Sequence, residues 1–161
     1  RMLLEERVSI RRLDLILEAL ADLAIREPDA SEWRALEVVR QRLARAISAK
    51  FTDEDDVMRF AMLDPAGEDA LHLALEADRF GEPLFRLEPN REKALLDALR
   101  EAVSAFEIAE MAPIILVDSE LRFPLKKLAE ANAIPCDMIA VAEIDPAASV
   151  EQTVVVEWNG T

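Results

Sequence analysis

Few side chains in this sequence have the type and spacing that chemistry requires. The single histidine, His72, lies between two leucines, and the single cysteine, Cys136, follows a proline. A nucleophile needs a general base beside it, and no motif supplies one to either residue. We therefore expect His72 at the surface or its boundary and Cys136 as a small buried thiol.

The aspartates suggest two further kinds of site. Asp118 follows the apolar run Ile114–Val117, where an open α/β sheet places functional groups, so a phosphoacceptor or small enzyme centred on Asp118 is one hypothesis. The chain has only 3 glycines and no phosphate-binding loop, which favours helix capping by Asp118 or Ser119. The acidic run Asp53–Asp56 lacks the ligand spacing and glycine of a calcium loop, so we expect a solvated linker. No catalytic residue, cofactor or metal site is predicted.

The charge of the chain restricts its partners. The net charge is −14, and residues 51–161 carry 24 acidic but only 9 basic side chains. Such a surface repels nucleic-acid phosphates and anionic lipid headgroups, and it favours basic protein partners. No apolar run reaches the roughly 18 residues of a membrane helix. A lone cysteine excludes an internal disulfide and is typical of a reducing compartment.

Two amphipathic helices are predicted in the first 52 residues. The first spans residues 9–25 with Ser9 as its N-cap and ends before Pro28, which lacks an amide donor. The second begins at Asp29. The residues expected to face inward recur at steps of three and four: Leu13, Ile16, Leu17, Leu20, Leu23 and Ala24 in the first helix, and Leu36, Val39, Leu43 and Ile47 in the second.

The second helix is also basic. Its arginines are Arg34, Arg40, Arg42 and Arg45. A solvated face is the usual explanation for such a run, and the alternative is contact with an acidic patch on a neighbouring copy. Because head-to-tail contacts between unlike surfaces close into rings, we take these four arginines as candidate self-association residues.

After residue 52 the hydrophobic period alternates between two and 3.6. Strands are predicted at 58–62, 84–87, 114–117, 138–141 and 153–158, with helices after Pro65, from Asn90 and after Asp118. The expected fold class is α+β or α/β, with a helical subdomain over 1–52 and a small sheet with packed helices over 53–161.

Five segments in order resemble one family. Val8–Ala21 resembles the pattern Val-Ser-Ile-Arg-acidic-Leu followed by Ile-Leu-Glu-Ala-Leu-Ala, and Glu37–Arg45 resembles a Glu-aromatic-Val-Arg-x-x-Leu-x-Arg helix. Leu63-Asp64-Pro65, Pro113–Arg122 and Glu143-Ile144 complete the series. This order is similar to the cytoplasmic domain of the major export-gate protein of type III secretion systems, flagellar or injectisome. The candidate motif positions are Asp118, Glu120, Arg122 and Glu143.

Some positions depart from that family. Arg12 stands where an acidic residue is usual, Asp118-Ser119 replaces Ser-Pro, and Ile139-Ala140-Val141 replaces Leu-Ser-Tyr. With these substitutions the chain resembles a divergent member of the family.

The resemblance implies a non-enzymatic docking and assembly module. Its implied partners are chaperone–substrate complexes, gatekeeper proteins, the ATPase stalk and other copies of itself in a ring. The implied location is the cytoplasmic face of the bacterial inner membrane. The membrane region would lie in a part N-terminal to this chain, which begins with Arg1. The alternatives are the enzyme centred on Asp118 and an unrelated acidic adaptor domain.

Overall fold

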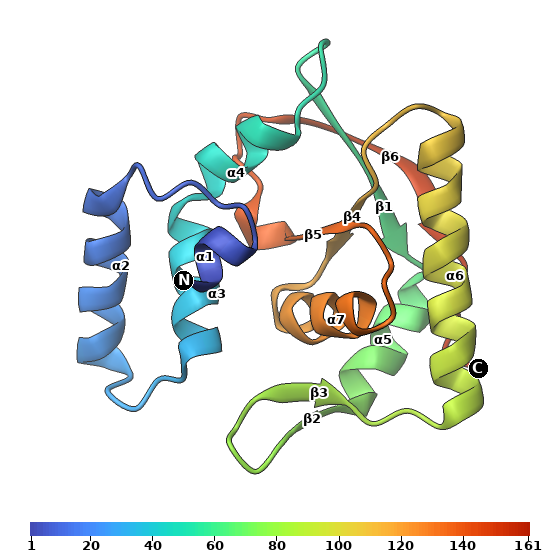
Figure 1. Ribbon diagram of the computed structural model, residues 1–161, viewed down its shortest axis with the longest axis horizontal. Helices are drawn as coiled ribbons and strands as arrows, with labels where there is room; N and C mark the ends of the chain where they lie inside the picture. The colour runs from blue at the N-terminus through green and yellow to red at the C-terminus, as the bar shows by residue number, and fades with distance from the viewer.

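The computed structural model describes all residues, 1–161, and begins with four helices. Helix α2 lies beside α3 at one side of the molecule, and α4 leads toward the sheet (Figure 1). The Ser31 hydroxyl caps α3 by accepting a hydrogen bond from the Arg34 amide at 3.4 Å, which satisfies a free amide of the first turn. The bounds are α1 Met2–Glu5, α2 Leu13–Arg26, α3 Glu32–Arg42 and α4 Ala44–Phe51.

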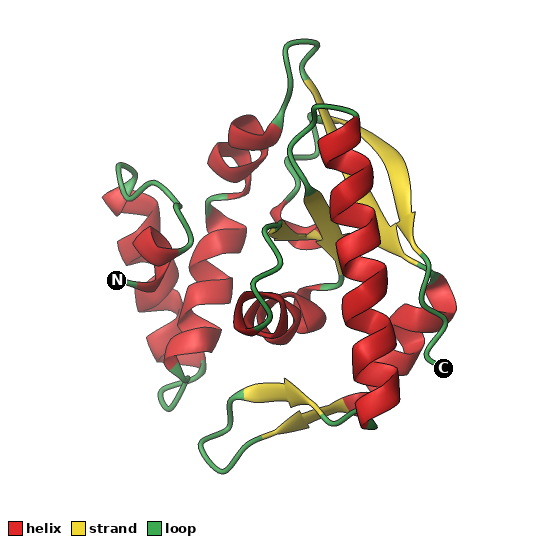
Figure 2. Ribbon diagram, turned by 45° about the vertical axis from the view of Figure 1, so that its right-hand side comes forward, coloured by secondary structure: helices red, strands yellow, loops and turns green.

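Four parallel strands then form the main sheet, in the order β5-β4-β1-β6. Helices connect β1 to β4 and β4 to β5, as parallel pairing requires, and α6 and α7 lie on the same face of the sheet (Figure 2). The predicted fold class, a helical part followed by a small sheet with packed helices, is confirmed. The elements are β1 Val57–Leu63, α5 Pro65–Ala74, α6 Pro89–Ile108, β4 Ile114–Val117, α7 Ser119–Ala131, β5 Asp137–Ala140, the 3-10 helix η1 Val141–Glu143 and β6 Ser149–Val156.

The two faces of the sheet belong to different cores. All four residues of β4 are buried, as predicted for a strand covered on both sides. Ile115 and Val117 pack in a core with α5, α6 and α7, whereas Ile114 and Leu116 pack in a core with α2, α3 and α4. The helical residues therefore share a core with the sheet. The boundary between residues 52 and 53 stays a prediction.

A two-stranded hairpin lies outside the main sheet. Its antiparallel strands are β2 Leu75–Ala77 and β3 Pro83–Phe85, and Gly81 supplies the positive φ of +78° in its turn. The Trp33 indole donates to the Gly81 carbonyl at 3.1 Å, and Lys127 pairs with Glu82. The hairpin is thereby fastened to both α3 and α7. Only its second strand was predicted, because Leu75–Ala77 continues the apolar pattern of α5.

Several predicted helix starts are wrong by a few residues. Helix α2 begins at Leu13, and the Ser9 hydroxyl instead accepts from the Arg11 amide at 3.4 Å. Ser31, not Asp29, caps α3, and Glu88 rather than Asn90 precedes α6. The second predicted helix is two helices that meet at Leu43. Short polar residues offer several caps close together, so the pattern alone does not select among them.

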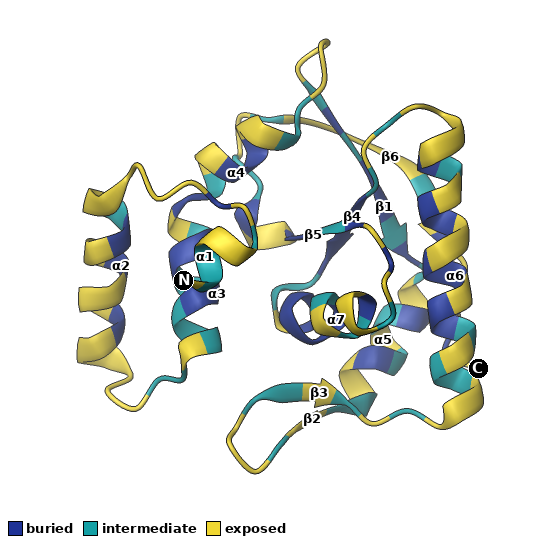
Figure 3. Cartoon of the chain, viewed as in Figure 1, coloured by how far each residue is buried: buried dark blue, intermediate teal, exposed yellow.

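The outward side of α2 and most of β6 are exposed, whereas β4 and the inner sides of α6 and α7 are buried (Figure 3). Among the predicted inward residues of α2, Ile16 and Leu23 are buried, but Leu13, Leu17 and Leu20 are 57%, 63% and 38% exposed. The prediction for those three, and for Ala24, which is also exposed, is wrong because α2 packs chiefly on α3 and buries one narrow face. None of the helices has the length and apolarity needed to cross a bilayer.

Candidate interaction surfaces

Asp118 and His72, far apart in the sequence, lie together at the carboxyl end of β4. Asp118 is the N-cap of α7, accepting from the Glu120 amide at 2.9 Å, and its own amide donates to Glu68 at 3.0 Å. The His72 ring lies 3.9 Å from an Asp118 oxygen and 3.8 Å from a Glu120 oxygen. All three side chains are at least 37% exposed. The predicted cap is confirmed, and the group forms an open, acidic surface patch.

Cys136 lies at the opposite end of the sheet. In the parallel register Ile114 pairs with Asp137 and Val117 with Ala140, so Cys136 precedes β5 at the edge farthest from Asp118. The thiol is buried, as expected, and burial raises the pKa of Cys136 to about 11. It is therefore protonated at neutral pH and has no histidine partner.

The acidic run before β1 is organised by its own backbone. One Asp53 carboxylate oxygen accepts from the Asp55 amide at 2.9 Å and from the Val57 amide at 3.0 Å. The other oxygen of Asp53 pairs with Arg59. This arrangement agrees with the predicted turn-forming linker.

The predicted basic face of α3 and α4 does not exist as one surface. Arg34 pairs with Glu27 at 2.9 Å and Arg42 with Asp22 at 3.0 Å, both within the chain. Arg40 is only 3% exposed, which makes it unavailable to a neighbouring copy. Of the four arginines, only Arg45 is exposed without an ion pair. Self-association through Arg34, Arg42 and Arg45 stays a prediction, whereas the burial of Arg40 excludes it from such a contact.

Arg40 instead belongs to a buried ionic cluster of Glu6, Glu37, Arg40, Arg122 and Glu143. Arg40 holds both oxygens of Glu143 at 2.6 and 2.7 Å. Arg122 holds Glu37, with Nε at 2.9 and 3.0 Å from its oxygens. Because both pairs are bidentate, they are geometrically specific as well as strong. The Glu143 carboxylate also accepts from the Ala140 amide at 3.2 Å.

Glu6 bridges the two arginines. Its carboxylate lies 2.6 Å from Arg40 Nη1, and 2.9 and 3.2 Å from the two terminal nitrogens of Arg122. The cluster therefore joins the segment after α1 to α3, α7 and η1. Three carboxylates face two guanidinium groups, so the cluster has an excess negative charge when all five groups are ionised.

Burial and ion pairing shift the pKa values of two members of the cluster, Glu37 and Arg122. Burial raises the pKa of Glu37 above its usual value, and the Glu143 charge adds to this effect while Arg122 opposes it. Burial acts to lower the pKa of Arg122. Its hydrogen bonds to Glu37 and the charges of the nearby carboxylates act in the opposite direction and are together the stronger effect, so the pKa is raised and Arg122 stays charged. Two of the candidate motif positions, Arg122 and Glu143, are thus parts of this internal cluster. Sequence reasoning did not connect them.

Helix α2 and the residues before it expose several large apolar side chains. Leu13, Leu17 and Leu20 lie at helical spacing on its outer side, and Ile10 precedes them at 42% exposure. We call these four residues the α2 surface. A groove of about 320 Å³ adjoins it, lined by Leu3, Ile16, Leu20 and Leu36 among other residues of α1, α2 and α3. An exposed apolar face beside an apolar groove is typical of a protein-binding site.

Comparison with known proteins places the chain in a family. The model of the FHIPEP family matches residues 1–149. Invasion protein InvA of Salmonella typhimurium is 30% identical over 148 residues, which are 92% of this chain and 21% of InvA. Flagellar biosynthesis protein FlhA of Bacillus subtilis is 26% identical over 155 residues, 96% of this chain and 22% of FlhA. The chain thus spans about a fifth of these relatives.

The fold is also that of a solved relative. The structure of the Chlamydia pneumoniae CdsV protein in complex with CdsO matches with a TM-score of 0.81 and 26% identity, covering 96% of this chain and 44% of the CdsV chain. The chain belongs to the FHIPEP family, the type III secretion export-gate family that its motifs resemble, and corresponds to the C-terminal cytoplasmic part of those proteins.

Proposed function

We propose that this chain is a non-enzymatic docking and assembly module of a type III secretion export apparatus. Family membership supports this role, and CdsV, which shares the fold, has been solved bound to a second protein. The partners proposed for this chain are chaperone–substrate complexes, gatekeeper proteins and the ATPase stalk. The proposed location is the cytoplasmic face of the inner membrane.

The α2 surface carries the assembly part of the proposal. Leu13 and Leu17 are more than half exposed, although large apolar side chains are normally buried on folding. Each would contribute about 1.5–3 kcal/mol if fully buried in a contact, before the entropy of association is subtracted. We propose that the α2 surface, and not the predicted arginine face, contacts a neighbouring copy.

The charge distribution supports the docking part. The acidic excess lies after residue 50, beyond the four N-terminal helices apart from the last residue of α4. Complementary charge on two proteins accelerates their association, and like charge disfavours the binding of wrong partners. The acidic part is therefore suited to partners with basic surfaces, and the apolar α2 surface is left for self-contact.

Sedimentation velocity of the chain from about 10 µM to 1 mM tests self-contact. We expect the weight-average mass to rise with concentration, and Leu17→Glu to abolish the rise because a buried unpaired carboxylate is unfavourable. Leu73→Glu is the matched control, since Leu73 is 90% exposed on α5 and distant in sequence from the α2 surface. A strictly monomeric wild type, or equal loss in both variants, would contradict this proposal.

A further inference from the structure

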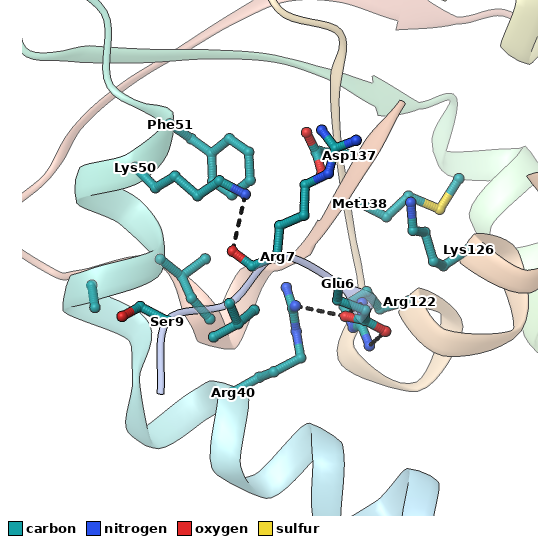
Figure 4. Close-up of a pocket in the computed structure, with 13 residues that line it drawn as sticks. Glu6, Arg7, Ser9, Arg40, Lys50, Phe51, Arg122, Lys126, Asp137 and Met138 are labelled. Carbon is teal, nitrogen blue, oxygen red and sulfur yellow. Dashed lines mark hydrogen bonds and ion pairs between the residues drawn. The ribbon is translucent and has the colours of Figure 1, made fainter. Parts of the chain in front are cut away.

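A small cavity lies beside the ionic cluster, between the segment after α1, the helices α4 and α7, and β5. Its volume is about 140 Å³. Apolar side chains that include Val8, Ile47, Phe51 and Met138 line part of it, and Arg7, Lys50 and Lys126 contribute to the remainder (Figure 4). Typical small-molecule pockets are about 300–1,000 Å³, so this cavity is too small for a nucleotide or cofactor and matches a single side chain.

The cavity is positive in an otherwise strongly negative protein. Five of its lining residues are basic and two, Glu6 and Asp137, are acidic, whereas the whole chain has 33 acidic and 19 basic side chains. Two of the basic groups, Arg40 and Arg122, are already paired with the cluster glutamates. The remaining three basic groups, opposed by the single carboxylate of Asp137, therefore determine what the cavity can bind.

Two of these three cations have no ionic partner. Neither Arg7 nor Lys50 has a carboxylate oxygen within 4.0 Å, although the chain has an excess of acidic groups. The Lys50 ammonium contacts the Arg7 carbonyl at 3.5 Å and lies 4.6 Å from the centre of the Phe51 ring. Lys126 is held by the Cys136 carbonyl at 3.1 Å and by Glu130 at 3.3 Å. Charge pairing inside the chain thus leaves Arg7 and Lys50 free.

The same part of the fold already binds one carboxylate. Glu6, the residue before Arg7, inserts its carboxylate between Arg40 and Arg122. Arg7 then takes a left-handed backbone conformation with φ of +57°, which turns the chain between the two side chains. In Figure 4 the Glu6 carboxylate lies at Arg122, whereas the Arg7 side chain extends away from it toward Asp137. Glu6 therefore fills the inner anion position, and the cavity beside it stays open.

We propose that this cavity receives one acidic side chain of a protein partner, with its carboxylate between Arg7 and Lys50 and its methylene groups against Val8, Ile47 and Met138. The proposal rests on the proposed docking function. It identifies a contact of opposite sign to the acidic surface, so a partner that uses both would present a basic surface with one projecting carboxylate.

Chemical-shift titration at low ionic strength tests the cavity directly. The probe is N-acetylglutamate amide, and its neutral isostere N-acetylglutamine amide is the ligand control. We expect saturable shifts of the amides of residues 7, 50 and 138 with a Kd on the order of 1–10 mM for the glutamate probe only, as is reasonable for exposed ion pairs. Inorganic phosphate is added in a separate titration to compare a free anion with a carboxylate side chain.

Variants locate the interaction. Lys50→Met and Arg7→Asn, the latter chosen because asparagine tolerates positive φ, should each weaken binding roughly two- to fivefold, and together they should abolish saturation. Lys93→Met on α6 removes another unpaired exposed cation and should leave binding unchanged. Equal shifts with both amides, tighter saturation by phosphate, or equal loss in Lys93→Met would overturn the assignment. Because no partner protein is used, such a failure would leave the docking function itself intact.

Discussion

Replacing Arg122 by methionine tests whether the buried cluster holds the two parts of the fold together. Arg122 is 1% exposed and donates to both Glu37 and Glu6. Its removal leaves three carboxylates with Arg40 as their only cation. Breaking a buried ion pair on one side costs about 3–5 kcal/mol, because a buried charge is left uncompensated. Since whole domains are stable by about 5–15 kcal/mol, we expect a large fall in the denaturation midpoint.

Urea unfolding followed by circular dichroism at pH 7 gives the magnitude. Arg100→Met is the control, because Arg100 forms an exposed pair with Asp97 that should contribute at most about 1 kcal/mol. The double variant Arg122→Met with Glu37→Gln removes charge on both sides of the pair and should recover part of the loss, giving a coupling energy of about 0.5–3 kcal/mol.

The pH dependence gives an independent check. Burial raises the pKa of Glu37 in the folded protein, and loss of Arg122 removes a cation that opposes this rise. The folded state then binds more protons than the unfolded state above the unfolded-state pKa, so stability increases as pH falls toward that value. The loss of unfolding free energy caused by Arg122→Met should therefore be smaller at pH 5 than at pH 7. A deficit below about 1 kcal/mol, or one that does not change with pH, would refute this account of the cluster.

Three further outcomes follow from the packing. Gly67→Ala should lose about 1–3 kcal/mol in urea unfolding, because a β-carbon there collides with the Trp158 carbonyl oxygen. Cys136 should react with a thiol reagent only under unfolding conditions at pH 7.5, and rapid reaction of the native protein would contradict its burial and its raised pKa. Asp118→Ala should lose about 1 kcal/mol whereas Asp118→Asn keeps the cap, and a phosphoryl adduct on wild type after incubation with Mg²⁺ and acetyl phosphate would instead favour the enzyme hypothesis.

Local patterns predicted most of the elements of the sheet. Ile114–Val117 is a continuous apolar run, and it forms the strand with all four residues buried. Asp118 offers a cap directly after that run, and it is the N-cap of α7. These features depend on neighbours in the sequence, so the hydrophobic period and the capping residues contain the information. The pairing order of the strands depends on distant contacts, and no local pattern specifies it.

The ionic cluster could not be predicted from local patterns. Arg40 bonds to Glu143 across 103 positions of sequence, and Arg122 to Glu37 across 85. In a helix whose neighbouring positions are also charged, nothing in the 3.6-residue period separates a buried arginine from a solvated one. A usable signal existed in the resemblance, since Glu37, Arg40, Arg122 and Glu143 all lie in the segments that resemble the export-gate family.

Arg40 and Leu17 both lie opposite to where they were predicted, and the cause in each case is the number of elements that pack around the residue. Arg40 was predicted at the surface and lies inside, whereas Leu17 was predicted inside and lies at the surface. The segment after α1, the helices α3 and α7, and η1 meet at the cluster, so charges there are compensated by partners from distant segments. Helix α2 meets chiefly one neighbour, so an apolar pattern wider than that contact leaves leucines uncovered. The motif residues Arg40, Arg122 and Glu143 thus hold the module together. Partner recognition is expected at the α2 surface, which lies within the first motif segment, and at Arg7 and Lys50, which lie outside the motif segments.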